Sequence, residues 1–407
     1  MQNKGGIPII LSIAGILVAL ISGSRSFFIG YLISLLFIVL VYRNYKVSIR
    51  NVAISVFSLC FLVYSLVSFI KPDSSLGRKL VYKISFQILN DHYISGIGFG
   101  NFGQVYGEYQ INYFAKGDFT IKELLLADNT KHAFNDYLQF IIEGGILGCL
   151  ALILFVALII YVIKIALRKY PKSILLVLSI AQLIVIAVAA IFMHVFEKPW
   201  IQLITVILLI FIIKYAYLNE KKQSFFYVLI VSTIFFICYY HYGFYVMNYK
   251  KFEKFEEAKQ LGLMGFNTDS FSILESLYPT LKDDVGFLTE YASLLTLHGK
   301  HSEAEKIYLM VVRKNNSNIF YLNLAKSYLQ SRKYRDAEQA YLKSINRAPN
   351  RFVPRFELYN FYKATQQFHK AKRQGNEILK LPVKIPSLVV DQIKKEVFTT
   401  INTLTIN

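Results

Sequence analysis

Seven apolar stretches in the first 250 residues constrain the fold of this chain more than any other feature. Each is close to the roughly 17 to 25 residues that a helix needs to cross a bilayer. The stretches cover residues 7–22, 27–42, 52–70, 137–163, 173–193, 200–217 and 225–247. We therefore expect residues 1–247 to form an all-α, polytopic membrane helix bundle of about seven helices.

Lys and Arg gather in every second loop between these stretches, and such basic loops stay on the cytoplasmic side of a membrane. The basic loops follow the second, fourth and sixth stretches. Alternation then places Arg25, the long loop 71–136, the short loop 194–199 and the whole tail after Met247 on the outer face. We expect a multi-pass protein of the cytoplasmic membrane in which Arg25, His132 and His194 share the outer compartment.

The net charge of +19 could indicate a nucleic-acid partner, but topology explains much of it, and the tail contains no block of basic residues. We therefore expect no nucleic-acid binding. Cys60, Cys149 and Cys238 all lie inside apolar stretches, where they are typical of buried small hydrophobes rather than of disulfides or metal ligands. The outer loop has no His, Asp or Glu at ligand spacing, so we also expect no metal.

From about residue 284 the sequence repeats itself every 33 to 34 residues. Two copies share the same residue types at matching positions: Lys300, Ala304, Glu305 and Tyr308 recur as Lys333, Ala337, Glu338 and Tyr341. This pattern resembles tetratricopeptide repeats, in which pairs of helices bury their apolar faces by stacking. We expect an α-solenoid over residues 284–407 behind a helical connector at 248–283. Such a stack could bind a protein partner or act as a rigid spacer.

The long outer loop contains two further features. Its glycine-rich turn at 96–102 is not expected to hold a nucleotide, because neither the strand before it nor the helix after it is evident. Farther on, His132 precedes the fourth apolar stretch and is a plausible proton acceptor. Glu143 would enter the membrane, where a carboxylate is functional or caps a helix. The loop with His194 and Glu197 is typical of a solvated connection.

Four segments together carry a family resemblance. Residues 23–26 (Gly-Ser-Arg-Ser), Arg78, the turn 96–102 and the stretch 135–148 resemble the superfamily of O-antigen ligases, O-antigen polymerases and protein O-oligosaccharyltransferases. The resemblance covers about residues 7–217. Asn135, Gly145 and Gly148 fit the spacing of the ligase motif, whereas the histidine of that motif falls on Phe134 and the nearest histidine is His132.

The resemblance implies transfer of a glycan from an undecaprenyl diphosphate carrier to a glycan, lipid or protein acceptor, with no other cofactor. Arg25 and Arg78 are then candidates to bind the diphosphate, because a guanidinium pairs two oxygens at once. His132 is the candidate catalytic base beside Arg25, while Asn135 and Glu143 are candidates for substrate binding. The repeats would position the acceptor or recruit a protein.

A second interpretation is a non-catalytic, membrane-anchored scaffold for envelope polysaccharide assembly. Members of the family generally have more spans than this chain, which implies that N-terminal helices are missing and favours the scaffold. A glycan polymerase of the same family is a third possibility. If His132 is the base, residues 131–134 must be extended, with the next helix starting near Asn135 or Asp136. His132 would then turn toward Arg25, while Phe134 packs against the outer loop.

Overall fold

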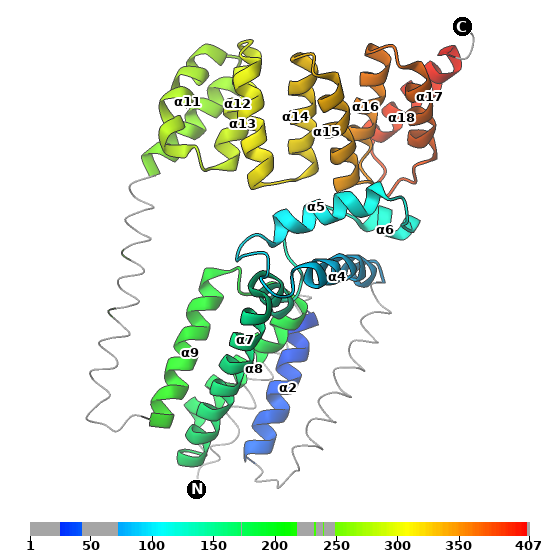
Figure 1. Cartoon of the computed structure of the whole chain (residues 1–407). Coiled ribbons are helices and arrows are strands. Elements are labelled where there is room, and N and C mark those ends of the chain that lie inside the picture. The colour runs from blue at the N-terminus through cyan, green and yellow to red at the C-terminus, as the bar shows by residue number, and fades with distance from the viewer. Residues whose placement is uncertain are drawn as a thin grey trace. The chain divides into compact units, whose positions relative to one another are not determined.

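The computed structural model describes residues 25–42, 72–171, 173–217 and 249–404, together with the single residues 232 and 239. Regular structure in these residues is helical throughout (Figure 1). The chain divides into two compact units, each made of two separate pieces of sequence. Unit 1 holds Met1–Phe102 and His132–Ile234, and unit 2 holds Gly103–Lys131 and Phe235–Asn407.

Unit 1 contains three described helices that are long and apolar enough to cross a membrane. These are α7 (Asp136–Lys169), α8 (Ile174–Phe192) and α9 (Pro199–Tyr217). A fourth, α2 (Arg25–Tyr42), carries a shorter apolar segment. The predicted spans 7–22, 52–70 and 225–247 lie outside the described residues, so the count of seven spans stays a prediction.

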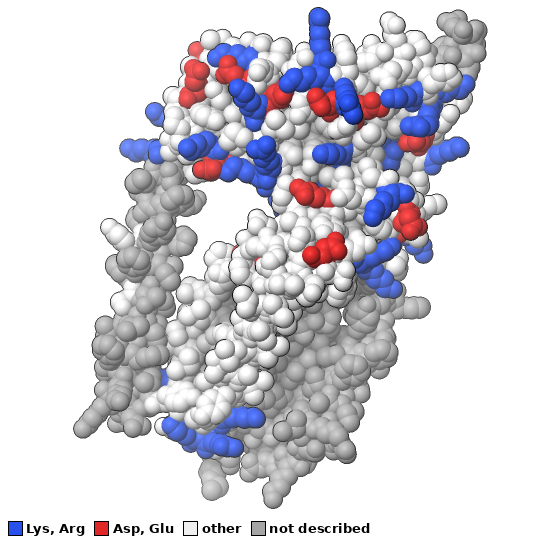
Figure 2. All heavy atoms as spheres, in the orientation of Figure 1, with Lys and Arg blue, Asp and Glu red and all other residues white. Residues whose placement is uncertain are grey.

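The membrane helices pack around α8, whose small and branched side chains let its neighbours approach closely. Ile38 of α2 meets Val177 and Ala181 of α8 in one fully buried cluster. By contrast, α7 exposes large apolar side chains along most of its length, including Leu147, Leu150, Ile153, Leu154 and Phe155. Exposed apolar surface of this extent is typical of a lipid-facing helix. Figure 2 shows this surface free of charge over most of its length, while unit 2 carries both signs.

Unit 2 confirms the predicted repeats through three successive helix pairs. The pairs are α12 (Val285–Leu297) with α13 (His301–Lys314), α14 (Asn318–Gln330) with α15 (Tyr334–Arg347), and α16 (Phe352–Ala364) with α17 (Phe368–Lys380). Ala304, Ala337 and Ala371 are fully buried at equivalent places in the second helices, as the small residue of the period predicts. Helix α18 (Leu388–Leu404) closes the stack against α17 and α16.

The predicted connector is also helical, because residues 249–263 form a helix and α11 (Asn267–Leu281) follows it. The outer loop is unexpectedly rich in helix. It begins with α4 (Pro72–His92) in unit 1 and continues with α5 (Phe102–Ala115) and α6 (Ile121–Leu126). Residues 103–131 pack within unit 2, against the turns that join α13 to α14 and α15 to α16 (Figure 1). The sequence analysis had treated this segment as part of the outer loop alone.

Candidate functional site

The site is organised by the start of α7. Asn135 caps this helix, and its side-chain oxygen accepts a hydrogen bond from the amide of Leu138 at 3.0 Å. The helix therefore begins at Asp136, as predicted from the two residues able to cap it. Residues 131–134 precede the helix without regular structure, and Gln139 accepts the amide of Ala133 at 3.2 Å. This leaves His132 on irregular chain just outside the apolar part of α7.

Asp136 connects this helix start to the loop between α8 and α9. One of its carboxylate oxygens accepts the amides of Val195 at 2.8 Å and Phe196 at 3.2 Å. The next residue of α7, Tyr137, donates its hydroxyl to the carbonyl of Ala187 in α8 at 2.9 Å. These bonds hold the loop 193–198 against the irregular segment that carries His132.

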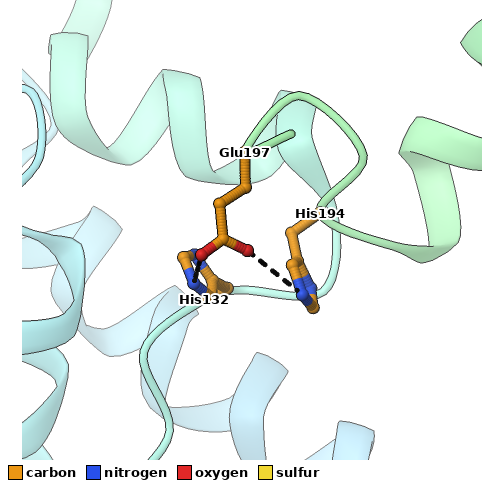
Figure 3. A group of neighbouring side chains, drawn as sticks. All are labelled: His132, His194 and Glu197. Atoms are coloured by element: carbon orange, nitrogen blue, oxygen red, sulfur yellow. Dashed lines mark ion pairs between the residues drawn. The ribbon is translucent and has the colours of Figure 1, made fainter. Parts of the chain in front are cut away.

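Three side chains meet there: His132, His194 and Glu197 (Figure 3). The Nε2 atom of His132 lies 3.2 Å from one oxygen of Glu197, and the Nε2 atom of His194 lies 3.4 Å from the other. The two imidazole rings are stacked, with centroids 4.6 Å apart and planes 12° from parallel. One carboxylate thus bridges two parallel imidazoles.

This arrangement favours one positive charge rather than two. Burial, followed by the adjacent charge of His132, lowers the pKa of His194, although Glu197 and Asp136 oppose that shift. The lowered pKa disfavours the protonated form of His194 in the folded chain. Half of the Glu197 side chain is exposed, so the cluster is open to solvent on that side.

Phe134 and Arg78 extend the same cluster. The ring of Phe134 meets His194 edge to face at 5.5 Å, and its carbonyl accepts the hydroxyl of Tyr82 at 3.4 Å. The guanidinium of Arg78, on α4, lies 5.8 Å from the centre of the Phe134 ring. Phe134 has a φ of 54°, a left-handed conformation that turns its side chain back toward these neighbours. Phe134 therefore contacts Arg78 and Tyr82 of the outer loop, against which it was expected to pack, and His194 of the site as well.

The glycine-rich turn docks onto a kink in α7. Gly145 interrupts the helix with φ 60° and ψ −150°, and this frees main-chain groups around it. The amides of Ile97 and Gly98 donate to the carbonyls of Ile142 and Glu143 at 3.1 and 2.9 Å. A Cβ on Gly145 would lie 2.5 Å from the amide nitrogen of Gly96, so only glycine fits where the two backbones touch.

Glu143 sits at the same junction and is buried. Its Oε1 atom accepts the amide of Phe102 at 3.3 Å and the side-chain amide of Gln139 at 3.2 Å. Because Phe102 is the first residue of α5, Glu143 places its charge at the N-terminus of that helix. A helix thus does follow the glycine turn, contrary to our expectation, although α4 rather than a strand precedes it.

The structure links His132 to Arg78, two of the predicted site residues, through His194 and Phe134, while Asn135 and Glu143 cap the starts of α7 and α5. The backbone of Arg25 opens α2, but its side chain lies outside the described part of the chain. His132 contacts His194 and Glu197, which the sequence analysis had interpreted as a solvated connection. Their shared outer compartment was the available signal, because alternation of the spans places both loops on one side.

The cluster could also hold a divalent cation. One donor atom from each of His132, His194 and Glu197 can be chosen so that all lie within 4.8 Å of one another. Two imidazole nitrogens and a carboxylate oxygen are ligands that zinc commonly takes. The spacing rules applied to the sequence could not reveal this group, since its members come from two loops about sixty residues apart.

Comparison with known proteins identifies the membrane part. Residues 10–153 match the family described as O-Antigen ligase, so this chain carries an O-antigen ligase domain over those residues. The matched range includes the glycine turn, the kink at Gly145 and His132, whereas Glu197 lies beyond it. No curated protein matches the chain.

Solved structures resemble the repeat part at low similarity. A crystal structure of Podosopora anserina kinesin light chain nearly identical TPR-like repeats is 14% identical, with a TM-score of 0.31, and covers 38% of this chain and 93% of that one. The MamA RS-1 ArsTM double mutant is 16% identical, also with a TM-score of 0.31, and covers 38% of this chain and 94% of that one. The repeat assignment rests on the period and the helix pairs.

Proposed function

We propose that this chain transfers a glycan from an undecaprenyl diphosphate carrier to an acceptor hydroxyl at the outer surface of the cytoplasmic membrane. The observation that carries the proposal is one continuous cluster of side chains. Arg78 lies over Phe134, Phe134 contacts His194, and His194 stacks on His132 beside Glu197. A guanidinium for the diphosphate and a proton acceptor for the hydroxyl are the two groups that this reaction needs.

His132 serves as the base in this proposal. When neutral, His132 donates its Nε2 proton to Glu197 and keeps the Nδ1 lone pair for the acceptor hydroxyl. The carboxylate also stabilises the imidazolium that forms when His132 takes the proton. The hydroxyl oxygen attacks the anomeric carbon, and the bond from that carbon to the diphosphate oxygen breaks. The lipid diphosphate leaves with the electron pair.

Arg78 and Arg25 bind the departing diphosphate in this proposal, because their planar guanidinium groups can each pair two oxygens. Asn135 and Glu143 each use one oxygen to cap a helix start. We assign them to substrate binding through the amide of Asn135 and the second carboxylate oxygen of Glu143. A polymerase would use the same chemistry with a second carrier-linked glycan as acceptor.

The test measures glycan transfer in cells supplied with carrier-linked glycan. We expect His132→Ala to abolish transfer at an unchanged protein level, and Phe134→His in that background to recover part of it. His369→Ala is the matched control, because His369 is exposed on α17 and should transfer normally. Wild-type transfer by His132→Ala would exclude His132 as the base and make the non-catalytic scaffold the better interpretation.

A further inference from the structure

Arg347 is the most deeply buried arginine among the described residues, with only 2% of its surface exposed at the end of α15. Its three guanidinium nitrogens all donate to main-chain carbonyls. Nη1 reaches Asp128 at 2.8 Å, Nη2 reaches Thr130 at 3.0 Å, and Nε reaches Asn316 at 3.2 Å. Burial lowers the pKa of Arg347 to about 10, which leaves the side chain positively charged at neutral pH.

A buried guanidinium is costly to desolvate, and hydrogen bonds to buried acceptors offset that cost. Here two of the three carbonyls belong to the outer-loop segment 103–131 rather than to the repeats. The segment reciprocates, because the side-chain amide of Gln110 donates to the carbonyls of Arg347 at 2.5 Å and of Asp128 at 3.1 Å. Arg347 is therefore the centre of a network that joins the repeats to the loop.

Neighbouring repeat residues bind the same stretch of loop main chain. Asn350 donates to the carbonyls of Leu125 and Ala127, both at 2.8 Å. The side-chain amide of Asn129 donates to the side-chain oxygen of Asn318 at 2.7 Å, and the main-chain amide of Asn318 donates to the side-chain oxygen of Asn129 at 2.9 Å. The turns of the repeats thus fix four of the six carbonyls from residues 125 to 130.

The stretch 125–130, whose carbonyls are bound by the repeats, ends two residues before His132. It also ends beside the point where the segment begins, because a Cβ on Gly103 would lie 3.2 Å from the carbonyl oxygen of Lys131. The loop therefore enters and leaves unit 2 at one place, with its outgoing end held by Arg347. Without these bonds, residues 128–131 would sample many main-chain conformations, and so would the residue that follows them.

We propose that Arg347 is a positioning residue for glycan transfer, acting through the main chain of residues 128–130 to limit the conformations of His132. The inference rests on the proposed function, in which His132 is the base. The role that it assigns to the repeats differs from both partner binding and rigid spacing. If fewer chains hold His132 in the conformation that reacts, the rate of glycan transfer falls in the same proportion.

The test uses the full chain and compares Arg347→Met with Arg351→Ala. Arg351 contacts the carboxylate of the same Asp128 at 3.4 Å but is half exposed, so its loss leaves the carbonyls of residues 128 and 130 bound. We expect Arg347→Met to lower transfer by about tenfold or more per folded molecule. Hydrogen exchange should rise over residues 125–135 and stay unchanged over α12 and α13. The Arg351→Ala variant should match the wild type in both measurements.

A double-mutant cycle with Glu197→Gln separates positioning from general stability. If Arg347 acts only by placing His132 against Glu197, Arg347→Met should cost much less in the Glu197→Gln background than in the wild type. Equal losses in both backgrounds would overturn the proposal, as would wild-type exchange at residues 131–135 in Arg347→Met. If the wild type itself shows no transfer, the proposed function fails, and the exchange measurement still decides whether Arg347 orders the segment.

Discussion

Replacing Gly145 with alanine tests the junction between the glycine turn and α7. The backbone of Gly145, at φ 60° and ψ −150°, lies in a region that is essentially restricted to glycine. A Cβ there would also lie 2.5 Å from both the amide nitrogen of Gly96 and the carbonyl oxygen of Ile94. Since both are main-chain atoms, they cannot move aside as a flexible side chain would. We therefore expect the turn to separate from the helix.

The magnitude follows from the strain that the new Cβ adds to the closed state. Forcing a side chain into this conformation costs about 1–3 kcal/mol, and the clash with two main-chain atoms places the cost at the upper end of that range. The bonds from Ile97 and Gly98 to α7 are lost on separation in both the variant and the wild type, so they do not change the difference between them. A loss near 3 kcal/mol corresponds to a factor of about a hundred in the local closing equilibrium. Gly144→Ala is the matched control, because a Cβ there meets only the ring of Phe99 at 3.2 Å.

Hydrogen exchange in the detergent-solubilised full chain measures this equilibrium. The amides of Ile97 and Gly98 should exchange about a hundredfold faster in Gly145→Ala than in the wild type. The same amides in Gly144→Ala should stay within about threefold of the wild type, since the Phe99 ring can move aside. Equal protection in the two variants would refute the assignment of Gly145 as a required contact.

Three further predictions concern topology, pH and metal. Cysteines introduced in place of Lys116 and Gln330, both in unit 2, should react with a membrane-impermeant thiol reagent added outside the cell, and one in place of Tyr45 should not. The reverse labelling pattern would overturn the predicted membrane orientation. Because burial lowers the pKa of His194 in the folded chain, the unfolded chain binds that proton first as the pH falls. Thermal stability should therefore drop below about pH 6.5, and His194→Asn should lessen the drop; an identical pH profile would exclude His194 as the cause. Transfer should be unaffected by chelators but inhibited by added zinc, which would occupy the nitrogen donors of His132 and His194; restoration of a chelated enzyme by a divalent ion would contradict this.

The parts predicted from the sequence are those that repeat or obey a local rule. Apolar length placed α7, α8 and α9, a period of 33 to 34 residues placed the helix pairs, and the capping preference of Asn135 placed the start of α7. These signals act over one or two helical turns or recur along the chain. A single sequence is enough to reveal them.

The partners of His132 depend on contacts that leave no periodic pattern. Glu197 reaches His132 because Asp136 binds two amides in the loop before α9, and one carboxylate among many mixed charges does not indicate this. Residues 103–131 likewise pack within unit 2 through hydrogen bonds from polar side chains to main-chain carbonyls. Asn350 and Arg347 donate such bonds to Leu125 and Asp128. Main-chain carbonyls are present at every residue, so nothing in the loop sequence marks which ones are bound.

The two-piece construction of unit 2 has a consequence for how the protein is made. Asp128 and Arg347 are separated by 219 residues, so the outer-loop segment is synthesised long before the turns that bind it. Contacts of such high sequence separation form late and slow folding. During that interval the carbonyls of residues 125–130 are hydrated, and the segment is open to proteases and chaperones. Unit 2 can complete its fold only after Asn350 has emerged from the ribosome.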